Sequence, residues 1–450
     1  MLTDLVQQAG VVGAGGAGFP THVKLNAKAE YFIINAAECE PLIETDKFIC
    51  RQFAEKVVDG AVEIGKHLEA KHIVIALKGK YKKEIAALQK VIDEKGAKVE
   101  IFEMGSYYPA GDEQVMVEQV TGRSVPERGI PLAVGAVVDN VGTVMNVYDA
   151  LRGVPVTEKY LSVVGEVERP VMMKVPLGTP FLECIQAAKP KNKDFDIVRG
   201  GPMMGKVFSS MEEIAKLSIT KTDGNIIVLP KGHYLVQMAE KPLDRVMRLA
   251  QSSCLQCRAC TDQCPRYRLG HRIQPHMMMR AAFYEDKVTD PVQYERLYGD
   301  AMNCSECGLC EMYACPMGLS PRKVNIFLKG RLRAQGIDVP KSPTATAREA
   351  NLSGRAATDR LECRLGLRTY GLNHDAGDNC MVLEPEKVTI LFSQHIGKPA
   401  TCVVKQGDMV KKGDLVAAAA EGALSTNIHA SVDGVVESVD ERCVVIKRKG

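Results

Sequence analysis

Eight of the fifteen cysteines lie in two short runs whose spacing could bind iron and sulfide. The first run reads CLQCRACTDQCP over residues 254–265, and the second reads CSECGLCEMYACP over residues 304–316. The gaps of two residues let three thiolates from one turn of chain reach three irons of one [4Fe–4S] cube, and each run ends in Cys-Pro. The chemistry that this pattern favours is single-electron transfer.

The spacing predicts two clusters with crossed ligation. Where two such runs occur together, the last cysteine of each run ligates the other cluster. Cluster 1 would be held by Cys254, Cys257, Cys260 and Cys315, and cluster 2 by Cys304, Cys307, Cys310 and Cys264. The alternative is a pair of four-cysteine zinc sites, which usually combine two CxxC pairs across a longer loop. Three cysteines in a row, twice, favour the iron–sulfur interpretation.

A glycine-rich segment near the start of the chain could bind a second cofactor. Residues 13–20 read GAGGAGFP and contain the GxGxxG pattern of Rossmann dinucleotide sites. That fold requires a strand before the glycines, whereas the apolar residues of segment 2–9 have helical spacing. Pro20 also interrupts the place where a helix should continue and suits the first turn of a short helix after it. The glycines still allow backbone N–H groups to approach a phosphate or a flat ring.

The same segment resembles the GxGGAGFPTxxK loop of the flavoprotein subunit of respiratory complex I, which binds FMN and NADH. Further segments in the order of that family are NAAECEP at 35–41, YPAGDEQ at 108–114 and DNVGT at 139–143. By this resemblance, the FMN site would contain Gly13, Gly15, Gly16, Lys24, Asn35, Asn140 and Thr143. The residues facing NADH would be Phe19, Glu40 and Glu113. The chain departs from the family at Ala14 (arginine there), Ala37 (aspartate), Cys39 (glycine) and Asp112 (glutamate).

Two further segments resemble known modules. Residues 163–185 predict strand, turn, strand and helix, and resemble the soluble-ligand-binding β-grasp module of complex I and of the RnfC component of the Rnf ferredoxin oxidoreductase. A role in domain packing is favoured there over ligand binding. Residues 384–450 alternate apolar and polar positions and resemble a lipoyl/biotinyl barrel-sandwich domain. Its hairpin at 422–427 reads GALSTN and has no lysine, so we expect no lipoyl or biotin group and a packing or docking role.

The predicted fold class is therefore α/β and multidomain. The expected parts are a complex I flavoprotein-like FMN/NADH domain at 1–155, a β-grasp domain at 160–235, an all-α double-cluster ferredoxin domain at 240–332, a linker at 333–380 and an all-β barrel-sandwich domain at 381–450. Helices are expected within 271–300, with Met277 to Met279 in the core. The arginines around them are expected to form a solvated face rather than a docking surface for an acidic carrier; they are Arg266, Arg268, Arg272 and Arg280.

Composition excludes several classes of function. The net charge of +3 gives no argument for nucleic acid or an anionic membrane surface. The sequence contains no run of about 18 apolar residues, so no transmembrane helix is expected. The first residues lack the basic and apolar regions of a secretory signal. Clustered cysteines favour metal binding in the cytoplasm over disulfides.

The order of the segments, the length and the second cysteine run most resemble the cobalamin reductases of propanediol-utilisation microcompartments. The resemblance implies electron flow from NADH through FMN and two [4Fe–4S] clusters to cobalamin or another corrinoid, which would reactivate a B12-dependent diol dehydratase. It also implies a location in the cytoplasm, inside a bacterial microcompartment, with a shell protein or an adenosyltransferase as partner. No catalytic acid or base is expected. One alternative is an RnfC-like protein exchanging electrons with ferredoxin or a partner protein, and another is a non-catalytic electron-wiring protein.

Overall fold

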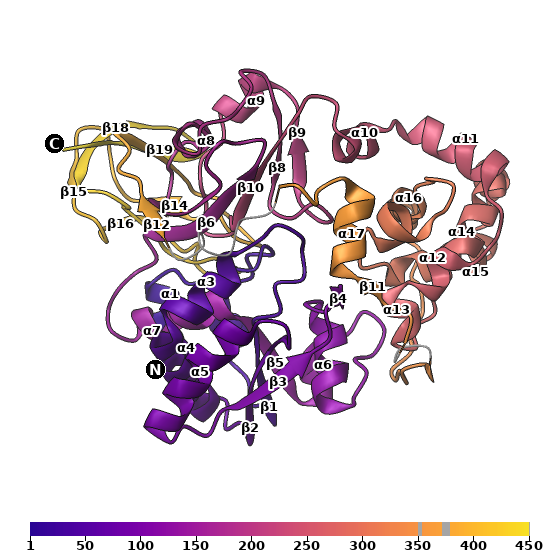
Figure 1. Ribbon diagram of the computed structural model, residues 1–450, viewed down its shortest axis with the longest axis horizontal. Coiled ribbons are helices and arrows are strands. Elements are labelled where there is room, and N and C mark those ends of the chain that lie inside the picture. The colour runs from indigo at the N-terminus through magenta and orange to yellow at the C-terminus, as the bar shows by residue number, and fades with distance from the viewer. Residues whose placement is uncertain (350–352, 371–378, 450) are drawn as a thin grey trace.

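The computed structural model describes residues 1–349, 353–370 and 379–449 (Figure 1). A four-stranded parallel sheet forms the centre of its N-terminal part. The order of its strands is β3 (Glu100–Met104), β2 (His72–Lys78), β1 (Tyr31–Asn35) and β5 (Ala136–Asn140). Strands β1 and β2 are almost continuously apolar because both faces of a parallel sheet are covered. The strand predicted at 31–35 is confirmed.

Helices cover the two faces of this sheet and bury alternate side chains of each strand. Phe32 and Ile34 face one core, whereas Ile33 faces the other. The first core includes helices α3 (Thr45–Gln52), α4 (Ala54–His67), α5 (Lys82–Lys95) and α7 (Val141–Ala150), and the second includes α6 (Glu113–Thr121). The carboxyl ends of β1 and β5 meet because Asn35 and Asn140 are paired in the register.

The glycine segment connects two helices, α1 (Leu2–Gln8) and α2 (Thr21–Lys24), and the helix predicted at its N-terminal side is confirmed. The segment folds back on itself, since the N–H of Gly13 donates to the carbonyl of Phe19 at 2.9 Å. Gly16 and Gly18 have φ angles of 117° and 69°, which glycine adopts without strain. The absence of a preceding strand separates this loop from a Rossmann fingerprint.

A six-stranded sheet follows in the sequence and lies above the first sheet in Figure 1. The order of its strands is β12 (Cys380–Val382), β7 (Val171–Pro176), β6 (Glu158–Gly165), β10 (Asn225–Leu229), β8 (Asp196–Arg199) and β9 (Lys206–Phe208). It packs against α8 (Phe181–Ala187) and α9 (Met211–Ala215) around a core of aliphatic residues and Phe181. Strands β6 and β7 followed by α8 confirm the predicted strand, turn, strand and helix.

The cysteine runs lie in a helical part at the right of Figure 1. Its helices are α10 (Tyr234–Glu240), α11 (Leu243–Ser253), α12 (Ala259–Asp262), α13 (Pro265–Arg268), α14 (Pro275–Ala281), α15 (Pro291–Tyr298) and α16 (Pro321–Ala334). Met278 and Met279 are buried in its core, as predicted, whereas Met277 is exposed. No helix among the described residues is long and apolar enough to cross a membrane.

The segment expected as a linker at 333–380 contains regular structure. Strand β11 (Ala356–Ala357) pairs with β4 (Tyr107–Tyr108), and α17 (Thr358–Leu365) follows it. Leu365 and Leu367, at the end of that helix, are fully buried. Their burial explains the difference from a plain connector: both leucines pack with apolar residues of the six-stranded sheet and of the second cysteine run. Residues 350–352 and 371–378 lie outside the described residues.

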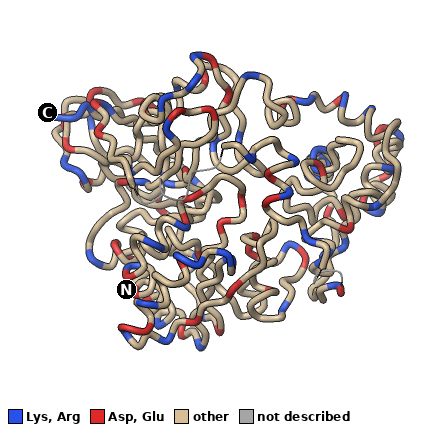
Figure 2. The backbone as a smooth tube through the Cα atoms, viewed as in Figure 1, with Lys and Arg blue, Asp and Glu red and all other residues tan. Residues whose placement is uncertain are grey.

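The C-terminal residues form two small sheets around one apolar core. The first has the order β13 (Lys387–Leu391), β19 (Cys443–Arg448), β18 (Gly434–Val439) and β15 (Met409–Val410), and the second has the order β14 (Thr401–Cys402), β16 (Leu415–Ala418) and β17 (Ile428–His429). Basic and acidic residues are interspersed along the chain (Figure 2), in keeping with a net charge of +3.

Candidate functional site

The glycine loop lies at the N-terminus of α7, which begins directly after β5. The N–H of Ala14 donates to the hydroxyl of Thr143 at 2.9 Å. Asn140 caps the helix by accepting from the N–H of Gly142 at 2.9 Å, and a Cβ on Gly15 would stand 3.3 Å from the Cβ of Asn140. The backbone from residue 15 to 17 remains exposed. The fold thus brings exposed glycine backbone and a helix N-terminus together, an arrangement suited to an anion.

Lys24 extends from α2 to the end of β5. Its ammonium donates to the carbonyl of Val138 at 2.7 Å and lies 3.2 Å from Glu113 and 3.6 Å from Asp139. Burial alone would lower the pKa of Lys24, but Asp139 and Glu113 raise it. Burial raises the pKa of Asp139 to about 6. Lys24 and Glu113, assigned to FMN and to NADH by the resemblance, therefore lie side by side.

Asn35 is the last residue of β1 and Glu40 follows the strand, and their side chains bind different partners. The amide of Asn35 donates to the carbonyl of Gly111 at 2.9 Å. Glu40 accepts from the N–H groups of Met203 and Met204, at 2.9 and 3.0 Å, in the loop between β8 and β9. Burial raises the pKa of Glu40 to about 7. No described contact joins Glu40 to the other two residues assigned to NADH, and its observed role is to dock the six-stranded sheet.

Lys159 is a residue near the glycine loop that no sequence pattern indicated. It lies on β6, is buried, and donates to the carbonyl of Ala14 at 3.2 Å. Burial lowers its pKa to about 8, against the attraction of Asp223 and Asp46. Lys159 therefore places a positive charge beside residue 14, the position at which the resembled family has an arginine. The signal in the sequence is weak, because a lysine in a strand usually faces solvent.

Asp46 completes the group of buried charges behind the loop. Its carboxylate accepts from the amide of Asn140 at 2.8 Å, and burial raises its pKa to about 6. A cavity of about 220 Å³ opens beside this group, between α7 and β6. Ala14 and Gly142 line it from residues 1–155, called the flavin part below after the predicted FMN site, and Lys159 and Tyr160 line it from the six-stranded sheet. The six-stranded sheet thus covers one side of the glycine loop at Ala14.

The four cysteines predicted to hold cluster 1 come from both runs and lie together. One small cavity is lined by Cys254, Cys257, Cys260 and Cys315. The backbone turns are alike in both runs, because Gln256 and Arg258 in the first and Glu306 and Gly308 in the second all have positive φ. In each run these positions stand two and four residues after the first cysteine. The repeated turn directs three thiols of each run toward one point.

The second set lies together as well. Burial raises the pKa of the Cys264 thiol to about 12, and the nearby Cys307 and Cys304 raise it too, whereas a hydrogen bond from the backbone of Tyr267 lowers it. The pKa of Cys310 is raised by burial and by Glu311, and then by the other three cysteines of this set. Cys264 is therefore near the second run, as crossed ligation requires. No three His, Cys, Asp or Glu side chains in the described ranges are placed to hold a single metal ion, whereas a four-iron cube spaces its thiolates more widely.

Nitrogen donors reach several of these sulfurs. The amide of Gln256 donates to the sulfur of Cys254 at 3.2 Å, and the N–H of Glu306 donates to that of Cys304 at 3.4 Å. Hydrogen bonds to cluster sulfurs are one of the means by which a protein sets the reduction potential. The donor set and the turns fit iron–sulfur clusters.

Direct contacts join the second cysteine set to the flavin part. The hydroxyl of Tyr108 donates to the carbonyl of Cys307 at 2.7 Å. Arg266, two residues after Cys264, forms a bidentate ion pair with Asp112 at 2.7 and 2.9 Å. The chain therefore connects the two cofactor-binding parts through buried polar contacts next to both sites.

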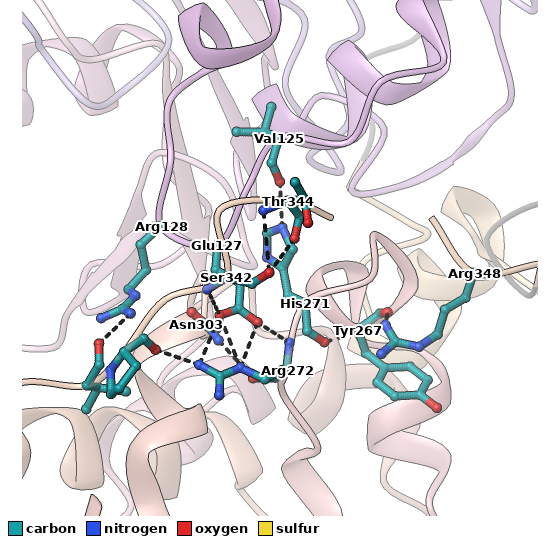
Figure 3. A network of polar contacts seen from close by, with 12 residues as sticks. Val125, Glu127, Arg128, Tyr267, His271, Arg272, Asn303, Ser342, Thr344 and Arg348 are labelled. Atoms are coloured by element: carbon teal, nitrogen blue, oxygen red, sulfur yellow. Dashed lines mark hydrogen bonds and ion pairs between the residues drawn. The ribbon is translucent and has the colours of Figure 1, made fainter. Parts of the chain in front are cut away.

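The prediction of a solvated arginine face is wrong for Arg266 and Arg268, whereas Arg272 and Arg280 are exposed as predicted. Arg266 and Arg268 are largely buried, and Arg272 pairs with Glu127 at 3.3 Å in the network of Figure 3. Glu127 also accepts from the N–H of Ser342 at 2.9 Å. These contacts lower the pKa of Glu127 although burial opposes the shift. The partners are far away in the sequence, so local patterning could not place these arginines.

Comparisons with known proteins agree with these parts. Family models match residues 6–149 (Nuo51 FMN-binding domain), 253–320 (4Fe-4S dicluster domain) and 380–449 (RnfC barrel sandwich hybrid domain). The mixed α/β, multidomain fold class is thereby supported, with an FMN-binding domain, a dicluster domain and a barrel sandwich.

Curated relatives extend the comparison to the whole chain. The chain is 38% identical over 451 residues to the cobalamin reductase PduS of Citrobacter freundii, covering 99% of this chain and 96% of that protein. It is 39% identical over 453 residues to PduS of Salmonella typhimurium, with the same coverage. A component of the proton-translocating ferredoxin:NAD(+) oxidoreductase complex of Clostridium ljungdahlii is 33% identical over 273 residues, 59% of this chain and 56% of that protein. The chain belongs to the cobalamin reductase PduS family.

Proposed function

We propose that this protein is an NADH-dependent cobalamin reductase that uses FMN and two [4Fe–4S] clusters. The observation that carries the proposal is the direct link between the glycine-loop part and the second cysteine set, through Tyr108 to Cys307 and Asp112 to Arg266. Two cofactor sites joined in this way suit the transfer of electrons between them. Each NADH supplies two electrons, so one NADH would reduce two cob(III)alamin to cob(II)alamin and release one proton.

FMN would lie on the glycine loop, with its phosphate near the N-terminus of α7. Residues 15 to 17 are exposed, and no described atom lies within 4 Å of a Cβ placed on Gly16, so a phosphate could approach the backbone there. The helix N-terminus and the buried cation of Lys159 favour a dianion there. When bound, FMN accepts a hydride and releases electrons singly.

NADH would approach the open side of this loop. Lys24 holds Glu113 and Asp139 beside the end of β5, and Phe19 closes the glycine loop through its carbonyl. Glu113 remains partly exposed and is the acidic residue best placed to meet a ribose hydroxyl. Glu40 contributes indirectly, by fixing the six-stranded sheet against the flavin part.

Crossed ligation remains part of the proposal. Cys254, Cys257, Cys260 and Cys315 would hold cluster 1, and Cys304, Cys307, Cys310 and Cys264 would hold cluster 2. The role of a corrinoid as acceptor, and a location in a propanediol-utilisation microcompartment with a shell protein or an adenosyltransferase as partner, rest on the family alone.

A second function is favoured by one observation. The C-terminal barrel matches the RnfC model, and a component of a ferredoxin:NAD(+) oxidoreductase complex is among the relatives. Electron exchange with ferredoxin would use the same cofactors. A competition between cobalamin and ferredoxin therefore has to show which of them is the electron acceptor.

Anaerobic turnover of the full chain tests both functions. Purified protein should contain roughly eight irons and one flavin, as two cubes and one FMN require, and should oxidise NADH with cob(III)alamin faster than with ferredoxin. Cys257→Ser should lose corrinoid reduction and part of the iron. Cys363→Ser changes an exposed cysteine outside the runs and should behave as the wild type. Zinc in place of iron, missing flavin, or NADH oxidation without corrinoid reduction would refute the proposal.

A further inference from the structure

We propose that Lys221 and the hairpin at 422–427 hold the glycine loop in the shape that binds FMN, so that the C-terminal barrel controls flavin affinity. The inference rests on the FMN site of the proposed function. It assigns a positioning role to residues outside the flavin part, which lie on the six-stranded-sheet part and on the barrel.

Lys221 bridges the carbonyl of Gly10, at the start of the glycine loop, and the carbonyl of Asn427 in the barrel hairpin. It is 2% exposed, and its ammonium donates to the carbonyl of Gly10 at 2.6 Å and to that of Asn427 at 2.8 Å. Within the described ranges no carboxylate pairs with it. Burial lowers the pKa of Lys221 to about 7, and an amino group buried without a counter-ion depends on its hydrogen bonds to offset the lost hydration. Lys221 therefore fixes the separation between Gly10 and the barrel hairpin.

The turn that carries Lys221 is itself rigid. Arg199 pairs with Asp223, and the same carboxylate accepts from the N–H of Thr220 at 2.7 Å and from its hydroxyl at 2.8 Å. The N–H of Lys221 donates to the side-chain oxygen of Gln394 at 3.1 Å. Hydrogen bonds to Asp223 and to Gln394 therefore fix the backbone on which the Lys221 side chain is carried.

The far end of the loop is tied to the barrel in the same way. The carbonyl of Gly18 accepts from the N–H of Ile396 at 2.9 Å. A Cβ on Gly18 would stand 2.9 Å from the side chain of Thr222 and 3.4 Å from the Cα of His395. Both ends of the segment from Gly10 to Gly18 are therefore held by residues that lie outside the flavin part.

The second half of the hairpin is packed against the rest of the protein, whereas Gly422 at its start is exposed. Ser425 and Thr426 are fully buried, and Thr426 and Asn427 donate to the carbonyls of Gln7 and Gln8 at the end of α1, at 3.4 and 3.3 Å. A tip that carried a swinging lysine would have to be exposed. Here the second half of the hairpin supports the helix that leads into the glycine loop, which gives the barrel a mechanical role.

FMN affinity of the full chain tests the positioning role. Lys221→Met removes the donor but keeps the length of the side chain, and should raise the FMN Kd at least tenfold in a fluorescence titration, with an unchanged iron content. Lys412→Met is the matched control: Lys412 joins the barrel to Glu158 of β6 and does not contact the loop. Its Kd should equal that of the wild type.

A second pair of variants covers the case in which Lys221→Met does not fold. Ile396→Pro removes the N–H that donates to Gly18, whereas Ile396→Ala retains it; the side chain is 48% exposed, so neither change disturbs a core. Only the proline variant should bind FMN more weakly and show faster amide hydrogen exchange in residues 11–18. The inference is wrong if the folded Lys221→Met and Ile396→Pro proteins bind FMN within twofold of the wild type. If the wild type itself binds no FMN, the proposed function fails instead.

Discussion

The ion pair between Asp112 and Arg266 offers a test of how the flavin part is joined to the cysteine-bearing helices. The two side chains are 14% and 13% exposed and make two hydrogen bonds of 2.7 and 2.9 Å. Asp112 also caps α6 by accepting from the N–H groups of Gln114 and Val115. Substitution Asp112→Asn removes the charge but preserves the cap, because asparagine is an equally good N-cap residue.

The expected loss follows from the burial of the remaining charge. Breaking a buried pair by removing one partner costs about 3–5 kcal/mol, since the other charge stays desolvated. Burial opposes the ionisation of Asp112, but Arg266 and the two N–H groups hold its pKa below the ordinary 3.8. A depressed folded pKa stabilises the protein above 3.8, and this stabilisation is lost as the pH falls through the folded value. The variant should therefore lose less stability on acidification than the wild type.

Urea unfolding at pH 7 measures the effect, followed by far-UV circular dichroism because the chain has no tryptophan. Asp112→Asn should lower the free energy of the transition by about 3 kcal/mol or more. The double variant with Arg266→Gln should lose less than the sum of the single changes. Asp359→Asn is the control, since Asp359 pairs with Lys80 at 3.3 Å on the exposed surface and should cost about 0–1 kcal/mol. A loss below about 0.5 kcal/mol for Asp112→Asn would refute the reasoning.

Three further predictions concern single contacts. Tyr108→Phe leaves the carbonyl of Cys307 without its buried donor, should cost about 1–3 kcal/mol, and should speed the loss of iron to a chelator. Lys159→Met removes the cation beside Ala14 and should raise the FMN Kd about tenfold, a change of ~1.4 kcal/mol, whereas an unchanged Kd would exclude Lys159 from the site. The pKa of Glu40 is raised to about 7, so the folded chain binds the proton more tightly and stability falls as the pH rises from 4.5 to 7. Glu40→Gln should flatten this dependence in urea midpoints, and parallel profiles would contradict it.

Local patterns in the sequence predicted the elements that local forces determine. The helix before the glycine loop, the strand at 31–35 and the repeated cysteine turns follow from apolar spacing and from residue type. The lack of a lysine in the hairpin at 422–427 is read directly from the residue types. None of these inferences needed a partner from elsewhere in the chain.

Residues whose roles depend on distant partners were missed or misplaced. Lys159 and Ala14 of the glycine loop are 145 positions apart, Lys221 and Gly10 are 211 apart, and Arg266 pairs with a carboxylate 154 positions before it. A lysine or arginine usually faces solvent, and the sequence contains no signal for the tertiary packing that buries these three. Sequence patterns therefore indicate the loop but not the parts that hold it.

The closure of the chain on itself implies a thermodynamic link between the flavin and the barrel. The hairpin contacts α1 across 419 positions, and Lys221 joins both to the six-stranded-sheet part. If barrel opening disorders the glycine loop, FMN must stabilise the barrel as much as the barrel favours FMN. FMN at a hundred times its Kd would then raise the free energy of barrel opening by about 2.7 kcal/mol. Amide hydrogen exchange in β16 and β17 should slow accordingly, roughly a hundredfold. Exchange that slows only around β1 and β5 would show that the barrel folds independently of the flavin site.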